Sequence, residues 1–414
     1  MTRQTDPQAP HGNELRALSS LAFEELSRFP GAIKGMHLGI AERAFRGAGP
    51  AARPVQVIHD TISTGAYGAI SSAARAVGHS ADLALETRGV GEDLPLSSTR
   101  EGSAVIAALN GLIGDHLERS RSPLHQQASI RVAGERVAVE RHSVQAAFPA
   151  AGPNLAVFLH GLMGTEFYWR WGSEEEVTYG SRLEADLGWT PVYVRYNTGR
   201  HISENGRSIA TLLEQLINAW PVEVEQIALV GHSMGGLVAR SAAHRASADG
   251  RTWTRHVTHV ISLGTPHLGA PLEQGAHRAA VALHKLPETR MLADLLRRRS
   301  AGIRDLRHGS LVDEDWQGRD PEALRTAACK EVPLLAGATH CFVSASLTQD
   351  PRHPVGRLVG DSLVLVPSAS GRGRARRIPF DARNGHHVGP THHLALLNHP
   401  QVYEQLHEWL RPAA

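Results

Sequence analysis

The feature that most constrains the fold of this chain is a glycine-rich turn between an apolar run and a segment of helical spacing. The apolar run is Ile227–Val230, the turn is Gly231–Gly235 (Gly-His-Ser-Met-Gly), and the helical pattern covers Gly236–Ala246. A short apolar run that ends in a turn is typical of a buried strand. The sequence therefore predicts a strand, a sharp turn and a helix in direct succession, with Ser233 at the carboxyl end of the strand.

Strands and helices alternate along the chain around this turn. The other predicted strands are Leu155–Leu159, Pro191–Tyr196, Val257–Leu263 and Cys341–Ala345, and further predicted helices are Ser208–Trp220 and Gln401–Leu410. Before them, Ser129–Val132 and Arg136–Glu140 alternate as two strands do, with Gly134 as a turn residue between them. Alternating strands and helices form a largely parallel sheet with helices on both faces. The predicted fold class is therefore α/β, with a mostly parallel sheet flanked by helices.

The first part of the chain differs in composition and spacing. Residues 1–12 are polar and contain proline, and we expect a flexible tail there. Residues 13–125 show helical spacing, and the predicted helices are Leu15–Leu26, Val55–Val77 and Ala104–Leu117. The sequence thus predicts a helical N-terminal extension, followed by the α/β domain over residues 126–414.

Composition excludes several classes of partner. The 414 residues are 42% hydrophobic and 20% charged with a net charge of +2, so we expect no nucleic-acid partner. Two cysteines, Cys329 and Cys341, are too few for a disulfide framework. No apolar stretch reaches the ~18 residues of a membrane span, and the first residues lack the apolar core of a signal peptide. We expect a soluble, cytoplasmic protein; docking of the N-terminal helices on a membrane, a lipid body or a partner is the alternative.

The turn around Ser233 has the pattern Gly-x-Ser-x-Gly in the strand–turn–helix setting of a nucleophile elbow. A hydroxyl needs an adjacent base that a third group orients, and in this arrangement the acid and then the histidine follow the serine. Asp361, in a loop after the predicted strand Cys341–Ala345, is the candidate acid. The histidine belongs in a loop just before the last helix, which favours His393, with His392 as the alternative. The other histidines of this region are expected to be surface or loop residues: His386, His387 and His399.

An oxyanion formed at Ser233 would need hydrogen-bond donors, and two backbone N–H groups are candidates. Met234 follows the candidate nucleophile, and Leu162 lies in His160–Gly164 (His-Gly-Leu-Met-Gly), directly after a predicted strand. One such hydrogen bond lowers a reaction barrier by roughly 3 kcal/mol. The histidines of the two turns, His160 and His232, are expected to be structural.

Four segments resemble the lipase and esterase branch of the α/β-hydrolase superfamily, and more closely lipase-like proteins related to the GPI inositol-deacylases. They are His160–Gly164, Gly231–Gly236, Leu263–Gly269 (Leu-Gly-Thr-Pro-His-Leu-Gly), and Gly360-Asp361 with His393-Leu394. The resemblance covers residues 150–414 and implies the α/β-hydrolase fold. It also implies a helical cap or lid over residues 271–340, and a carboxylic ester with an apolar acyl group as substrate.

These expectations define a serine hydrolase of lipid metabolism that cleaves small-molecule or lipid esters. Ser233, His393 and Asp361 would act as a triad through an acyl-enzyme. Neither a metal nor an organic cofactor is expected. The alternatives are thioester cleavage or acyl transfer by the same triad, and a non-catalytic binding module on the same fold. The physiological ester and the oligomeric state stay open.

Overall fold

The computed structural model describes residues 14, 17–18, 95–173, 177–270, 299–320, 329–350, 353–373 and 376–412. The chain divides into two units: Met1–Ala108 with Leu117–His125, and Leu109–His116 with Gln126–Ala414. The predicted tail 1–12 and the predicted helix Val55–Val77 lie outside the described residues, as does most of Leu15–Leu26.

In the first unit, a short 3-10 helix precedes the long helix that both units share. The carboxylate of Glu14 accepts hydrogen bonds from the N–H (3.1 Å) and the hydroxyl (2.7 Å) of Ser97, in η3 (Leu96–Ser98). The shared helix α4 (Arg100–Arg119) confirms the helix predicted there. Its backbone leaves helical geometry at Ile113 (φ −137°, ψ 22°), within the stretch that belongs to the second unit.

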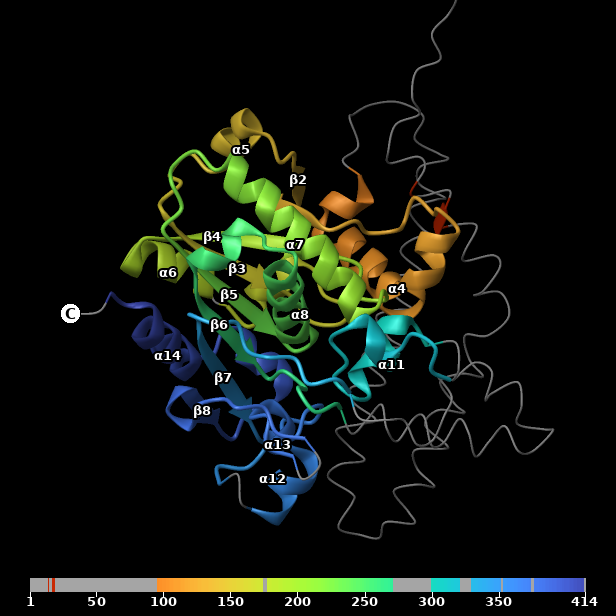
Figure 1. Ribbon diagram of the computed structural model, residues 1–414, viewed down its shortest axis with the longest axis vertical. Helices are drawn as coiled ribbons and strands as arrows, with labels where there is room; N and C mark the ends of the chain where they lie inside the picture. Colours follow the sequence, from red (N-terminus) through yellow and green to blue (C-terminus); the bar gives the residue numbers. More distant parts are fainter. Residues whose placement is uncertain are drawn as a thin grey trace, which may run out of the picture. The chain divides into compact units, whose positions relative to one another are not determined.

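The second unit is built on one eight-stranded sheet with the order β2-β1-β4-β3-β5-β6-β7-β8 (Figure 1). The strands are β1 (Ser129–Val132), β2 (Glu135–Val137), β3 (Asn154–Leu159), β4 (Trp189–Arg195), β5 (Gln226–His232), β6 (Val257–Leu263), β7 (Thr339–Ala345) and β8 (Gly385–Val388). β1 pairs antiparallel with β2 and β4, and the pairs from β4 through β8 are parallel. The predicted α/β-hydrolase fold, a mostly parallel sheet flanked by helices, is confirmed.

Each face of the sheet has its own apolar core and its own helices (Figure 1). Alternate strand residues point to opposite faces, so Val157 and Leu229 enter one core while Phe158 and Val230 enter the other. The main helices are α5 (Arg141–Ala147), α7 (Ile202–Ala219) and α8 (Met234–Ala248) on the first face, and α6 (Tyr179–Leu187) and α14 (Pro400–Leu410) on the second. Burying one such side chain stabilises the fold by about 1.5–3 kcal/mol. The two cores therefore fix the strands whose carboxyl ends carry the candidate residues.

Short elements complete the described chain. They are η4 (Glu166–Arg170), η5 (Thr252–His256), α11 (Ala301–Leu306), η7 (Asp313–Asp315), α12 (Pro354–Val359), α13 (Val366–Ala369), η8 (Ala382–Asn384) and η9 (His393–Leu397). The predicted strand Arg136–Glu140 was too long, because Glu140 already caps α5, a helix that we did not predict. Residues 271–298 and 321–328 of the predicted cap lie outside the described residues.

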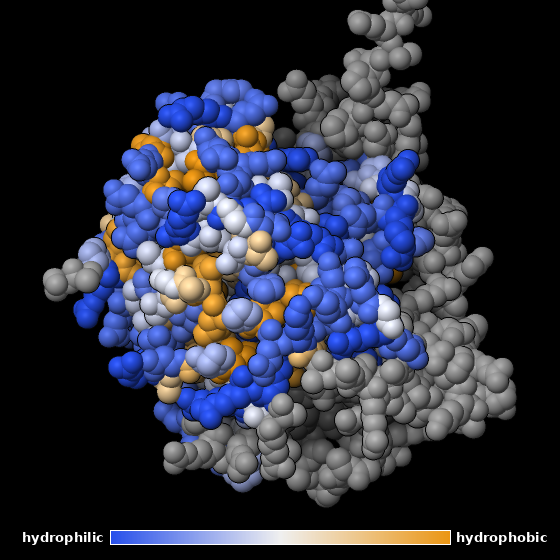
Figure 2. All heavy atoms as spheres, in the orientation of Figure 1, coloured by the Kyte–Doolittle hydropathy of each residue, from blue (hydrophilic) through white to orange (hydrophobic). Residues whose placement is uncertain are grey.

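The face in Figure 2 is mostly hydrophilic over the described residues, with apolar side chains gathered near α8 and β6. The large hydrophobic residues most exposed in the described chain are Trp171, Val177 and Val222. Within the described ranges, no helix combines the length and the apolarity that crossing a bilayer requires.

Candidate active site

Ser233 lies at the turn between β5 and α8 in a backbone conformation that is rare for a residue with a side chain. Its φ is 54° and its ψ is −123°, and such strain costs about 1–3 kcal/mol. Its N–H donates to the carbonyl of Leu263 at 2.8 Å, which ties the turn to the end of β6. Ser233 is half-buried, whereas His232 and Met234 on either side of it are buried. The strained turn thus exposes the residue that carries the hydroxyl.

The glycines of this turn meet a steric requirement. A Cβ on Gly231 would lie 2.4 Å from the backbone nitrogen of Gly236, and a Cβ on Gly235 would lie 2.1 Å from the carbonyl oxygen of Leu159. Both clashes involve backbone atoms of packed elements, which cannot move without distorting them. The tight turn at Ser233 therefore depends on the spacing Gly-x-Ser-x-Gly.

Asp361 and His393 form a buried pair beyond the carboxyl ends of β7 and β8. Nδ1 of His393 lies 2.7 Å from Oδ2 of Asp361, and the two residues are 3% and 1% exposed. The other carboxylate oxygen accepts the N–H groups of Leu363 (3.0 Å) and Val364 (2.8 Å). The main chain adds a hydrogen bond from the His393 N–H to the Asp361 carbonyl at 2.9 Å. A charged carboxylate accepts these bonds, so Nδ1 of His393 carries a proton.

The two adjacent histidines, His392 and His393, lie in opposite environments. The side chain of His392 is exposed and forms no hydrogen bond or ion pair with the described residues, and its main-chain carbonyl accepts the N–H of Ala395 at 3.0 Å. Nε2 of His393 is buried and has no hydrogen-bond partner in the described chain. The His393 ring packs against Gly264, where a Cβ would lie 3.2 Å from Nδ1 and Cε1. Gly264 directly follows Leu263, whose carbonyl binds the Ser233 N–H, so the structure brings His393 rather than His392 to Asp361 and the turn.

The turn after β3 lies beside Ser233, because β3 and β5 are paired neighbours in the sheet. A Cβ on Gly161 would lie 3.0 Å from Cβ of Ser233, a tight contact that would move one of the two turns by a few tenths of an ångström. The N–H groups of Leu162 and Met234 donate to no acceptor in the described part of the chain. The geometry is therefore compatible with a pair of oxyanion donors.

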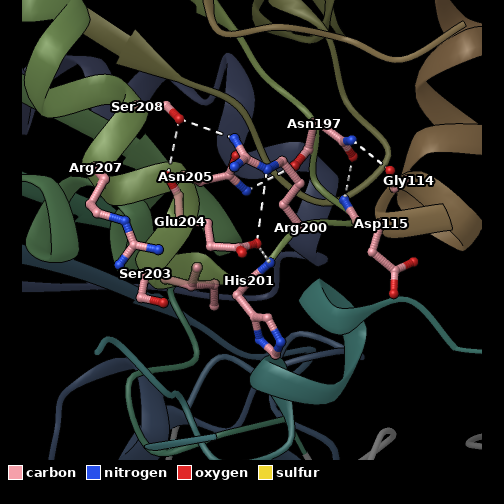
Figure 3. A network of polar contacts seen from close by, with 12 residues as sticks. Gly114, Asp115, Asn197, Arg200, His201, Ser203, Glu204, Asn205, Arg207 and Ser208 are labelled. Atoms are coloured by element: carbon pink, nitrogen blue, oxygen red, sulfur yellow. Dashed lines mark hydrogen bonds and ion pairs between the residues drawn. The ribbon is translucent and has the colours of Figure 1, made fainter. Parts of the chain in front are cut away.

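The loop after β4 supports the turn after β3. Met163 has a positive φ of 58°, and its N–H donates to Oγ1 of Thr198 at 3.1 Å. A buried network holds the Thr198 loop in place (Figure 3): the Asn197 amide donates to the carbonyl of Gly114 at 2.9 Å, and the Asn205 amide donates to the carbonyl of Asn197 at 2.8 Å. These supports come from distant parts of the sequence, and the sequence analysis missed them.

A buried ion pair fixes the segment that follows this turn. Nε of Arg195, at the end of β4, donates to the carboxylate of Glu166 in η4 at 2.7 Å, and a second guanidinium nitrogen bonds the other carboxylate oxygen. The side chains are 0% and 6% exposed. Bidentate geometry offsets part of the cost of burying two charges. We did not predict this pair, because nothing in the sequence links residues that lie 29 positions apart.

His160 has the structural role that the sequence suggested. Its ring stacks on Tyr196 with centroids 4.4 Å apart. Nδ1 donates to the carbonyl of Gly161 (2.9 Å), and Nε2 accepts the N–H of Tyr196 (3.3 Å). Burial lowers the pKa of His160 to about 4, so this ring is neutral at physiological pH.

His386 and His387 lie in β8, which corrects their expected surface or loop positions. His387 is half-buried, with Nδ1 at 3.0 Å from Oγ of Ser344 and Nε2 at 3.2 Å from Oγ of Ser346.

Across the ranges that the structure describes, no group of three His, Cys, Asp or Glu side chains could hold a metal ion.

The fold and this site together define an α/β-hydrolase-like protein. Residues 157–320, less than half of the chain, match the family described as "PGAP1-like alpha/beta domain", which agrees with the resemblance to lipase-like proteins. No protein of curated function matches the chain.

Several solved structures are similar to this chain. The mature lipase BlEst2 of Bacillus licheniformis is 19% identical, with a TM-score of 0.41, over 63% of this chain and 93% of that one. A lipase-esterase related protein of Clostridium acetobutylicum is 12% identical, with a TM-score of 0.34, over 63% and 96%. The type II thioesterase BorB of the borrelidin biosynthetic cluster is 16% identical, with a TM-score of 0.34, over 63% and 93%.

Proposed function

We propose that this chain is a serine hydrolase that cleaves carboxylic esters, with Ser233 as nucleophile, His393 as general base and Asp361 as the group that orients the base. The observation that carries the proposal is the 2.7 Å contact between Nδ1 of His393 and Asp361. Nε2 of His393 has no partner in the described residues, and the His393 ring packs against Gly264 and His232, on either side of the contact between the Ser233 N–H and Leu263. A nucleophilic hydroxyl needs a base with such a free acceptor nitrogen.

In the proposed reaction, the Ser233 oxygen attacks the ester carbonyl carbon and its proton passes to Nε2 of His393. The carbonyl oxygen becomes an oxyanion, which the N–H groups of Leu162 and Met234 stabilise. The bond to the alcohol oxygen then breaks, and that oxygen takes the proton from His393. Water attacks the acyl-serine and gives a proton to His393, which returns it to Ser233 as the carboxylic acid leaves. Asp361 stabilises the imidazolium in both halves.

As substrate we propose a small-molecule or lipid ester with an apolar acyl group. Support comes from the lipase-like sequence segments and from the match of residues 157–320. Residues 271–340 would form a cap within an α/β domain of residues 126–414. Thioester cleavage or acyl transfer would use the same groups and differ only in the leaving group or the acceptor.

Fractionation of cells that express the full chain tests the expected cytoplasmic location.

The test is hydrolysis by the full chain of p-nitrophenyl esters with short and long acyl groups, and of the matching thioesters. We expect wild-type turnover of at least one ester and no turnover by Ser233→Ala. A well-folded wild type that cleaves neither esters nor thioesters would overturn the proposal. A preference for thioesters of more than about tenfold, or 1.4 kcal/mol in barrier, would move the assignment to a thioesterase.

A further inference from the structure

We infer that His232 is a positioning residue for His393: its ring, attached next to Ser233, holds the main chain of the proposed base. This inference rests on the proposed function, because it assigns a role relative to that base. It goes beyond the expectation that His232 is structural, because it assigns the ring a role in placing the base.

The contact between the two histidines is direct. Nε2 of His232 lies 3.2 Å from the carbonyl oxygen of His393, and the ring centroids are 4.7 Å apart at 46°. Both residues are buried, at 1% and 3% exposure. Because His232 is bonded to Ser233, this hydrogen bond links the backbone of the proposed base to the chain of the proposed nucleophile.

The hydrogen bond also defines the tautomer of His232. A carbonyl only accepts, so Nε2 must carry the proton. Nδ1 is buried without a partner in the described chain. Burial lowers the pKa of His232 well below its usual value, and the titratable groups that face the ring in the described chain, His393 and His160, add to this effect. The ring therefore donates its hydrogen bond without placing a positive charge beside the imidazolium that His393 forms in the proposed reaction.

Among the described side chains that hydrogen-bond His393, His232 is the one that lies outside the loop of Asp361. The main-chain N–H and Nδ1 of His393 both bond Asp361, and the carbonyl accepts from His232. Without His232 the base would still be paired, but its distance to the nucleophile would be less constrained. A misplacement of ~1 Å can lower a rate by about 100-fold.

The test compares kcat, KM and the rate of labelling by a fluorophosphonate in wild type, His232→Leu and His232→Gln. We expect His232→Leu to lower kcat and labelling by roughly 10- to 100-fold, with KM changed less than about twofold. His232→Gln should recover most of this loss, because its amide N–H can donate to the same carbonyl. His259→Gln is the matched control: His259 is a half-buried histidine of β6 that bonds the hydroxyl of Thr258, and wild-type kcat is expected.

Equal losses in the Leu and Gln variants, or wild-type kcat in His232→Leu, would overturn the inference while the esterase proposal stands. If wild type itself neither labels nor turns over, the proposed function fails instead. A measurement on the wild-type chain covers the case in which His232→Leu does not fold. In 15N-histidine spectra, the His232 ring should keep its proton on Nε2 and should not titrate between about pH 5 and pH 8. A proton on Nδ1 of His232, or a titration in that range, contradicts the inference.

Discussion

Two glycine-rich turns at neighbouring strand ends have similar sequences but different surroundings. The turn after β3 reads His160-Gly-Leu-Met-Gly164, and the turn after β5 reads Gly231-His-Ser-Met-Gly235. Each contains a buried histidine and one residue other than glycine at positive φ, Met163 (58°) and Ser233 (54°). The two turns also pack against each other, because Gly161 lies against Ser233 and Gly235 lies against the Leu159 carbonyl.

The difference lies in what each histidine holds. His160 bonds its own turn and Tyr196 through both ring nitrogens, so it stabilises the turn locally. His232 bonds the carbonyl of His393, which is 161 positions away, so it ties its turn to another part of the site. Two turns of similar local sequence can therefore differ in role: the histidine of one stabilises its own turn, and the histidine of the other connects its turn to a distant part of the chain.

The strongest test of this difference replaces the residue at positive φ in each turn, Ser233 or Met163, by glycine. Ser233→Gly should lower kcat/KM by at least about 10⁴-fold, while the free energy of unfolding stays equal or rises because strain of about 1 kcal/mol is relieved. Met163→Gly should stay within about fivefold of wild type, or 1 kcal/mol in barrier. Ester hydrolysis and urea unfolding measure both. Comparable activity losses would show that the turns do not differ in this way.

The next test concerns His393, whose carbonyl is hydrogen-bonded by His232 of the β5 turn. His393→Ala should lower kcat by roughly 10³- to 10⁴-fold, because it removes the proposed acceptor of the Ser233 proton. His392→Ala should stay within about twofold, since it is an exposed side chain without a described partner. If His392→Ala shows the larger loss, the base has been assigned to the wrong histidine.

Alanine substitutions at two glycines should affect different properties: Gly235→Ala mainly the stability of the fold, and Gly161→Ala mainly the activity. A Cβ at Gly235 meets carbonyl oxygens at 2.1 and 2.7 Å, so Gly235→Ala should lower the free energy of unfolding by about 3 kcal/mol. A Cβ at Gly161 meets the Ser233 Cβ at 3.0 Å and Nδ1 of His232 at 3.2 Å. Gly161→Ala should therefore cost less than about 1 kcal/mol in stability but lower kcat about tenfold. Urea titrations and kinetics of both variants test this, and the reverse pattern would contradict the packing described.

An effect smaller than the stability loss at Gly235 is expected for the pH dependence of stability that His160 contributes. Its pKa is about 4 in the folded chain and 6.5 in the unfolded chain, so the unfolded chain binds the proton first as the pH falls. The contribution of the neutral His160 ring to the free energy of unfolding is complete above pH 6.5 and is lost progressively down to pH 4. Between pH 7 and pH 5 the loss is about 2 kcal/mol. Unfolding of His160→Gln should show a pH dependence smaller by that amount, and an unchanged dependence would show that His160 is not a buried neutral ring.

The sequence predicted the central strands because β3 to β7 are apolar runs that local patterns reveal. It did not predict β8, since Gly385-His-His-Val388 is polar and becomes a strand only by pairing with β7. The helix α5 was also missed, because it is short and buries only Val144.

For the candidate site, chain order and loop position were enough to select Ser233, Asp361 and His393, whose catalytic roles stay predictions. The pairing of His393 rather than His392 with Asp361 depends on the direction of adjacent side chains, which sequence patterns do not specify. The supports of the site, such as Arg195 with Glu166 and Thr198 with Met163, join distant segments. Such contacts arise from the folded topology and leave no local pattern.

The most direct test of the central claim is to locate the adduct that a fluorophosphonate forms with the full chain, by peptide mass spectrometry. The account predicts one adduct, on Ser233, that is absent in Ser233→Ala and forms far more slowly in His393→Ala. An adduct on another residue, or a well-folded wild type that forms none, would contradict the account of Ser233 as an activated nucleophile.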